Sequence, residues 1–185
     1  MSHPGPKGSF VLEVAPEPKS LFEIFCEGLK AAKEEYGVTI PWYVMTSREN
    51  NNQTIEFFEN NHYFGYPKEA IGFFMQGELP MVDTEGKILL DEEGIIKEAA
   101  DGHGGVFRAM VENNILKELR GKEIQWVFIV PVDNPLVKMV DEEALRNCNR
   151  KRSIITWKIF GKKESRRKSW RFLQEKWKTK CGRIY

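Results

Sequence analysis

Apolar side chains recur at helical spacing near the start of the chain and predict an amphipathic helix over residues 21–36. Ser20 and Glu23 form a capping-box pattern at its beginning, because a serine oxygen can accept a hydrogen bond from the backbone three residues later. Gly37 follows the last apolar position, where glycine commonly ends a helix. The pattern therefore indicates a helix with both ends defined by the sequence.

Continuous apolar runs predict three buried strands. They are residues 38–45, in which Pro41 favours a start at Trp42, residues 70–75, and residues 123–130, the most apolar of the three. Two helices are predicted between these runs. One opens from a polar loop at residues 48–53 and continues to about Asn60, and the other covers residues 104–119. A strand at 9–14 and a small hairpin joining 81–82 to 87–90 are also predicted. Alternating strands and helices predict an α/β fold with a mixed, mostly parallel sheet flanked by helices.

Composition narrows the class of protein. The 185 residues are 41% hydrophobic and 30% charged, which fits a chain that buries a core. No apolar run reaches the roughly 18 residues of a membrane span, and the start lacks a signal-peptide core, so neither a membrane segment nor secretion by a signal peptide is expected. Three scattered cysteines without zinc-site spacing favour a reduced, cytoplasmic location.

Charge is divided sharply along the chain. Residues 146–185 carry 15 Lys and Arg against two acidic residues, a net +13, whereas the whole chain has a formal net charge of +1. Such asymmetry usually indicates a basic tail or linker that binds nucleic acid. The sequence thus predicts a first region at 1–145 and a basic tail at 146–185.

Glycines and polar side chains gather where strands are predicted to end and helices to begin. Gln76 and Asp133 follow apolar runs, Gly102 and His103 open a helix, and Lys7 lies between Pro and Gly. In open α/β sheets ligands bind at the carboxyl ends of strands. Glutamine can read the edge of a base, a carboxylate can hold Mg²⁺, a glycine loop lets backbone approach a ligand, and a lysine can reach a phosphate. Each segment taken alone is more often an ordinary turn or loop than a binding site.

The order of these segments resembles the eukaryotic UDP-sugar pyrophosphorylase family, in particular its UDP-N-acetylglucosamine branch. The resemblance covers about residues 5–144 and rests on the segments Gly5-Pro-Lys-Gly8, Pro41-Trp-Tyr-Val-Met-Thr-Ser47, Phe73-Phe-Met-Gln-Gly77, Asp101-Gly-His-Gly-Gly105 and Val132-Asp-Asn134. It implies a Rossmann-like, glycosyltransferase-A-like nucleotidyltransferase fold. It also implies truncation at both ends, since the family's first strand and Gly-rich phosphate loop would precede the first matched segment.

The resemblance implies that UTP and N-acetylglucosamine 1-phosphate are converted to UDP-N-acetylglucosamine and pyrophosphate. The sugar phosphate attacks the α-phosphorus directly, so catalysis depends on positioning and charge neutralisation. By resemblance Lys7 contacts phosphate, Gln76 and Gly102 bind uracil, and Asp133 holds Mg²⁺. His103 stands where the acetylglucosamine enzymes carry Asn against the sugar or ribose, and it is more like the UDP-glucose branch. UDP-glucose or broad UDP-sugar specificity therefore stays open.

The basic tail has a second interpretation. Its last residues, 168–185, have no counterpart in the family. If codons that can encode these residues are read one base out of frame, the resulting amino-acid string resembles the family's continuation. We expect loss of the reading frame between about residues 161 and 168, and no specific nucleic-acid recognition. The alternative is a non-catalytic module whose tail, with Trp157, Trp170 and Trp177, binds RNA through charge and stacking. The sequence leaves the oligomeric state open.

Overall fold

The computed structural model describes residues 5–13 and 17–151. The chain forms two compact units, the first ending at Val140 and the second beginning at Asp141. The described part of the second unit contains helix α5 (Glu142–Lys151). Most of the predicted basic tail and the expected loss of frame lie outside the described residues, so both stay predictions.

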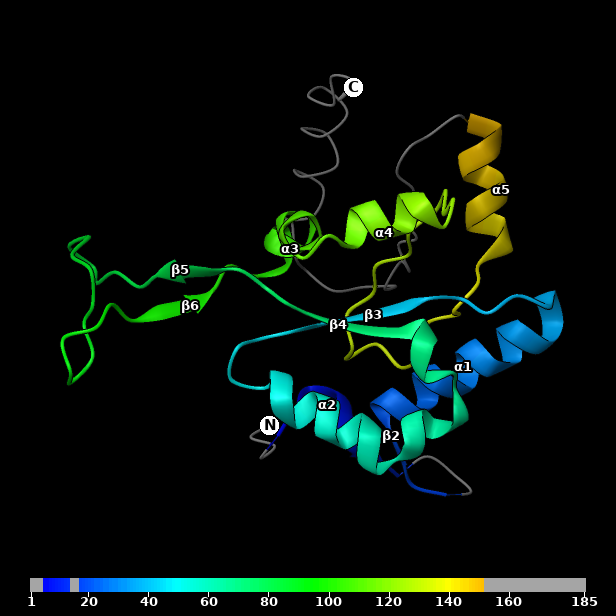
Figure 1. Cartoon of the computed structure of the whole chain (residues 1–185), viewed down its shortest axis with the longest axis horizontal. Helices are drawn as coiled ribbons and strands as arrows, with labels where there is room; N and C mark the ends of the chain where they lie inside the picture. Colours follow the sequence, from blue (N-terminus) through cyan, green and yellow to red (C-terminus); the bar gives the residue numbers. More distant parts are fainter. Residues whose placement is uncertain (1–4, 14–16, 152–185) are drawn as a thin grey trace, which may run out of the picture. The chain divides into compact units, whose positions relative to one another are not determined.

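Two parallel strands form the centre of the first unit, β3 (Trp42–Thr46) and β4 (Ile71–Met75) (Figure 1). Trp42 pairs with Ile71 and Thr46 with Met75. Parallel neighbours need a crossover. Here it contains α2 (Asn51–Asn60) and two short 3₁₀ helices, His62–Gly65 and Lys68–Ala70. The strands predicted at 38–45 and 70–75, the start at Trp42 and the α/β class are confirmed.

Alternation along β3 and β4 gives the pair two apolar faces, because successive side chains of a strand point in opposite directions. One face packs with α1 (Leu21–Tyr36) and α2 around Phe58, and the other with α3 (Val106–Glu112) and α4 (Ile115–Gly121) around Phe74. Figure 1 shows the two pairs of helices on opposite sides of the strands. The sheet is therefore the middle layer of three.

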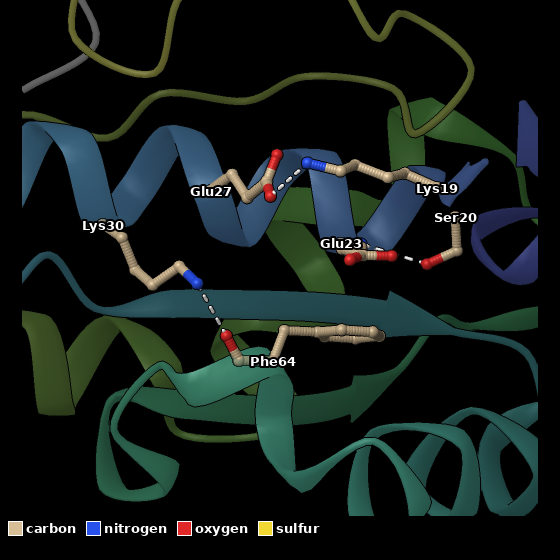
Figure 2. A network of polar contacts seen from close by, with 6 residues as sticks. All are labelled: Lys19, Ser20, Glu23, Glu27, Lys30 and Phe64. Atoms are coloured by element: carbon tan, nitrogen blue, oxygen red, sulfur yellow. Dashed lines mark hydrogen bonds and ion pairs between the residues drawn. The ribbon is translucent and has the colours of Figure 1, made fainter. Parts of the chain in front are cut away.

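Helix α1 begins and ends where the sequence predicted. The backbone N–H of Glu23 donates to Ser20 Oγ at 3.2 Å, and Gly37 closes the helix with a φ of 70° (Figure 2). The Lys19 Nζ also lies 2.6 Å from Glu27 Oε1 on the exposed side of this helix. The helix is thus fixed by its own capping residues as well as by packing.

The crossover contains a left-handed turn that the sequence did not indicate. His62, Tyr63 and Phe64 have φ of 51°, 53° and 53°, followed by Gly65 at 72°. Left-handed backbone costs roughly 1–2 kcal/mol for each non-glycine residue, so other contacts must stabilise it. Lys30 supplies one, since its Nζ donates to the Phe64 carbonyl at 3.0 Å (Figure 2).

We expect Lys30→Met to lower the free energy of unfolding by about 1–2 kcal/mol, because it removes a charged donor from a half-buried carbonyl. Urea denaturation followed by circular dichroism measures the change. Lys33→Met is the matched control, since Lys33 is an exposed lysine of the same helix. Equal stability of the two variants would show that the bond to Phe64 does not hold the turn.

The segment predicted as one helix at 104–119 is two helices. Asn113 donates from Nδ2 to the Ala109 carbonyl at 2.8 Å, and Asn114 adopts a φ of 59°. Asparagine tolerates this left-handed backbone better than most residues. The prediction of a single helix is therefore wrong, and the two helices α3 and α4 meet at this asparagine pair.

The prediction of a strand at residues 123–130 is also wrong. In the described part of the chain these residues join no sheet, and Trp126, Val127, Phe128 and Ile129 are 38–55% exposed. A strand needs a neighbour to receive its backbone hydrogen bonds, and in the described ranges β3 and β4 pair only with each other. The apolar run consequently forms no strand in the described part of the chain.

Two shorter predictions are only partly right. The strand predicted at 9–14 is reduced to β1 (Val11–Leu12), which pairs with β2 (Lys19–Ser20). The predicted hairpin keeps one bridge, Val82 with Ile88, inside a longer arm formed by β5 (Glu78–Pro80) and β6 (Glu98–Ala100) (Figure 1). None of the described helices is both long and apolar enough to cross a bilayer.

Candidate functional site

Gln76 and Gly77 lie directly after β4, at the carboxyl end of the parallel pair. The Gln76 N–H donates to the Thr46 carbonyl at 2.8 Å, so the backbone ladder continues one residue past the strand. The Gln76 side chain is half-buried and lines a hollow of about 250 Å³. A glutamine amide in such a hollow offers one acceptor and two donors to a flat polar ligand.

Charged residues line the same hollow, which is formed by Arg48, Met75, Gln76, Gly77, Glu78 and Glu98. Arg48 Nη2 lies 3.1 Å from Glu78 Oε2, and Nη1 lies 4.0 Å from Glu98 Oε2. Arg48, Glu78 and Glu98 are not among the site residues predicted from the sequence. The sequence feature that could have indicated this group is the position of Arg48 just after β3, since Gln76 follows β4 at the same edge of the sheet.

The Asp101–Gly105 segment lies beside this strand end. The Asp101 N–H donates to the Gly77 carbonyl at 3.0 Å, and Gly105 N–H donates to the Gly102 carbonyl at 3.1 Å. Gly102 has a φ of 75° and a ψ of −171°, a conformation that essentially only glycine adopts. His103 begins the 3₁₀ turn His103–Gly105 and is exposed. The structure thus joins Gly77, the residue after Gln76, to Asp101, the residue before Gly102. The lining of the hollow contains Gln76 and Gly77 but none of residues 101–105.

Lys7 and Asp133 are not joined to this group by any hydrogen bond or ion pair of the described residues. Lys7 is exposed on the short 3₁₀ helix Lys7–Ser9, and Asp133 is exposed in a turn where the Asn134 N–H donates to the Pro131 carbonyl at 3.2 Å. Within residues 5–13 and 17–151 no hydrogen bond or ion pair joins either side chain to Gln76 or to the Gly102 loop. Their roles in phosphate and metal binding stay predictions.

The donor set allows a limited test for Mg²⁺. In the part of the chain that is described, no group of three or more His, Cys, Asp or Glu is arranged to hold a metal ion. Mg²⁺ is commonly held by one or two carboxylates, with phosphates and water completing the octahedron. The exposed carboxylate of Asp133 fits this role as a single protein ligand to a nucleotide-bound ion.

A larger hollow, of about 390 Å³, lies beside α1 and is lined by Lys30, Lys33, Glu34, Gly65, Tyr66 and Pro67. It includes none of the predicted site residues. Volume alone does not identify a site, and the smaller hollow is lined by Gln76 at the carboxyl end of the parallel pair, where ligands of open α/β sheets bind. We therefore take the hollow at Gln76 as the candidate site.

Comparison with known proteins identifies related sequences. A family model described as UTP–glucose-1-phosphate uridylyltransferase matches residues 1–174. The UDP-N-acetylhexosamine pyrophosphorylase-like protein 1 of Xenopus tropicalis is 37% identical over 149 residues, which are 77% of this chain and 29% of that protein. The UDP-N-acetylglucosamine pyrophosphorylase of Saccharomyces cerevisiae is 38% identical over 140 residues, which are 74% of this chain and 29% of the yeast protein.

Solved structures agree in fold. A UDP-N-acetylglucosamine pyrophosphorylase candidate from Entamoeba histolytica superposes with a TM-score of 0.72 at 36% identity, over 80% of this chain and 38% of that chain. A UDP-glucose phosphorylase from Trypanosoma brucei superposes with a TM-score of 0.64 at 20% identity, over 80% of this chain and 32% of that chain, and this likeness shows the fold alone. The chain spans about three tenths of the length of the curated relatives it matches.

Proposed function

Because the chain belongs to the UTP–glucose-1-phosphate uridylyltransferase family, we propose that it is the uridine-binding part of a uridylyltransferase. The reaction joins UTP and N-acetylglucosamine 1-phosphate to give UDP-N-acetylglucosamine and pyrophosphate, and the names of the relatives support this choice of substrates. The observation that supports the proposal is the backbone hydrogen bond between Asp101 and Gly77, which joins the residue after Gln76 to the residue before Gly102.

The two segments have complementary roles toward uridine. Uracil presents two carbonyl acceptors around one N–H donor, and the Gln76 amide can pair with such an edge. Gly102 has no side chain and a positive φ, so its backbone can approach the base closely. Binding of this kind orients the nucleotide and leaves its phosphates free for reaction.

The transfer step needs positioning and positive charge rather than a protein nucleophile. Lys7 would place its ammonium against a phosphate as a point charge, and Asp133 would hold Mg²⁺ through one carboxylate. When bound, Mg²⁺ would supply neutralisation of phosphate charge. We also propose a cytoplasmic location, supported by the scattered cysteines, of which Cys26 is free and buried.

His103 is the residue of the site that bears on which sugar 1-phosphate is used. It is exposed on the Gly102 loop, where a sugar or ribose would lie in a nucleotide held by Gln76. Pyrophosphate release measured with N-acetylglucosamine 1-phosphate and with glucose 1-phosphate separates the two specificities. We expect the acetylated sugar to be preferred, because the curated relatives are named for N-acetylated sugars.

We expect Gln76→Ala to weaken uridine binding roughly 10-fold, a loss of about 1.4 kcal/mol, because the base loses its hydrogen-bonding partner. Isothermal titration calorimetry of the 185-residue chain with uridine measures the change. Gln53→Ala is the matched control, since Gln53 is exposed on α2. Unchanged affinity in Gln76→Ala, or equal affinity of the wild-type chain for uridine and cytidine, would contradict the proposal.

A further inference from the structure

The carboxylate of Asp101 fills the space between the two glycines of the candidate site. A side-chain carbon at Gly105 would lie 2.0 Å from Asp101 Oδ2, and one at Gly77 would lie 2.7 Å from the same oxygen. Both distances are far below a van der Waals contact of about 3.5 Å. A larger residue at either position would therefore displace the Asp101 carboxylate.

The backbone of Asp101 is fixed as well. Its N–H donates to the Gly77 carbonyl at 3.0 Å, directly after the pairing of Glu78 with Ala100 in the β5–β6 ladder. One side of the residue is thus tied to the strand end that carries Gln76. The other side, through the carboxylate, lies against the loop that carries Gly102.

We propose that Asp101 is a positioning residue that sets the distance between Gln76 and the Gly102 loop and so determines the selectivity for uracil. The inference rests on the proposed function of this site. Asp101 acts through its two neighbours and need not touch the nucleotide. Its volume keeps the loop from closing on Gly77, and its backbone bond keeps the loop from moving away.

The way Asp101 is buried supports a role other than stability. Its Oδ1 is buried and accepts no hydrogen bond from the described residues, and an unpaired buried oxygen costs roughly 1–3 kcal/mol. Arg108 responds to the negative charge, because its pKa is raised first by the hydrogen bond to Glu112 and also by Asp101. Most buried oxygens in proteins are paired, so the hydrogen bonds among the described residues do not account for the position of this carboxylate.

The test compares UTP with CTP on the 185-residue chain by isothermal titration calorimetry. We expect Asp101→Ala to reduce the ratio of the two affinities roughly 10-fold, equal to about 1.4 kcal/mol, because the loop can close on Gly77. Gly105→Ala should give the same loss, since its methyl group displaces the carboxylate. Asp101→Asn keeps the shape without the buried charge, so it should retain the wild-type ratio and melt at or above the wild-type temperature.

The outcomes are separable. A purely structural role would weaken both nucleotides equally and leave their ratio unchanged in Asp101→Ala and Gly105→Ala, which would overturn the inference alone. If Asp101→Asn also lowers the ratio of the UTP and CTP affinities, the volume of the side chain does not position the loop, and the inference is overturned. A wild-type chain without preference for UTP over CTP would overturn the proposed function together with this inference.

Discussion

Phe58→Ala is expected to lower the free energy of unfolding by about 3–5 kcal/mol. Phe58 is fully buried, and its ring centroid lies 4.8 Å from that of Phe22, 5.2 Å from Phe73 and 5.5 Å from Trp42. These rings join α1, α2 and both strands of the parallel pair. Truncation therefore leaves a cavity at the point where the elements meet.

The measurement is urea denaturation followed by tryptophan fluorescence, which is sensitive to Trp42 in this cluster. Phe107→Ala is the matched control, because Phe107 is 61% exposed on α3 and should change stability by less than about 0.5 kcal/mol. If Phe58→Ala is unfolded without denaturant, Phe58→Leu gives a smaller and measurable loss. A loss below about 1 kcal/mol in Phe58→Ala would show that this cluster is not the core.

Asp133→Asn is expected to weaken UTP binding in the presence of Mg²⁺ by about 30-fold, or about 2 kcal/mol. The carboxylate contributes both its charge and its oxygen to a hard cation, and the neutral amide replaces only the oxygen. Uridine carries no phosphate, so its affinity should be the same in the variant and the wild type. The effect should also disappear when Mg²⁺ is removed with EDTA.

Calorimetry with UTP and with uridine gives both affinities for each variant. Glu35→Gln removes one negative charge from an exposed position of α1 and controls for the change in net charge. Equal loss of UTP and uridine in Asp133→Asn would indicate a damaged base site rather than a lost metal ligand. Full retention of Mg²⁺-dependent UTP binding would contradict the assignment of Asp133.

The elements that the sequence predicted well are those with local signals. Ser20, Glu23 and Gly37 define the ends of α1, and the apolar runs of β3 and β4 have no competing pattern. The rule that ligands bind at the carboxyl ends of strands also singled out Gln76 before the fold was known, and Gly102 was singled out as the start of a helix. Local chemistry and one topological rule therefore account for the centre of the candidate site.

The elements that the sequence missed depend on contacts between distant residues. The left-handed turn ending at Gly65 has three non-glycine residues, and its support from Lys30 comes from another helix. The run at 123–130 has the composition of a strand, but composition does not supply the neighbouring strand that it needs. The carboxylate of Asp101 between Gly77 and Gly105 is likewise visible only in three dimensions.

The most direct test of the account is the location of uridine on the folded chain. Backbone amide signals in ¹H–¹⁵N NMR spectra can be followed while uridine is added. We predict that Gly77, Gly102 and Gly105 shift together and saturate at one dissociation constant, while Gly65 beside the larger hollow does not move. Shifts confined to Gly65 and its neighbours, or no shift at Gly77 and Gly102 at saturating uridine, would contradict the assignment of the site.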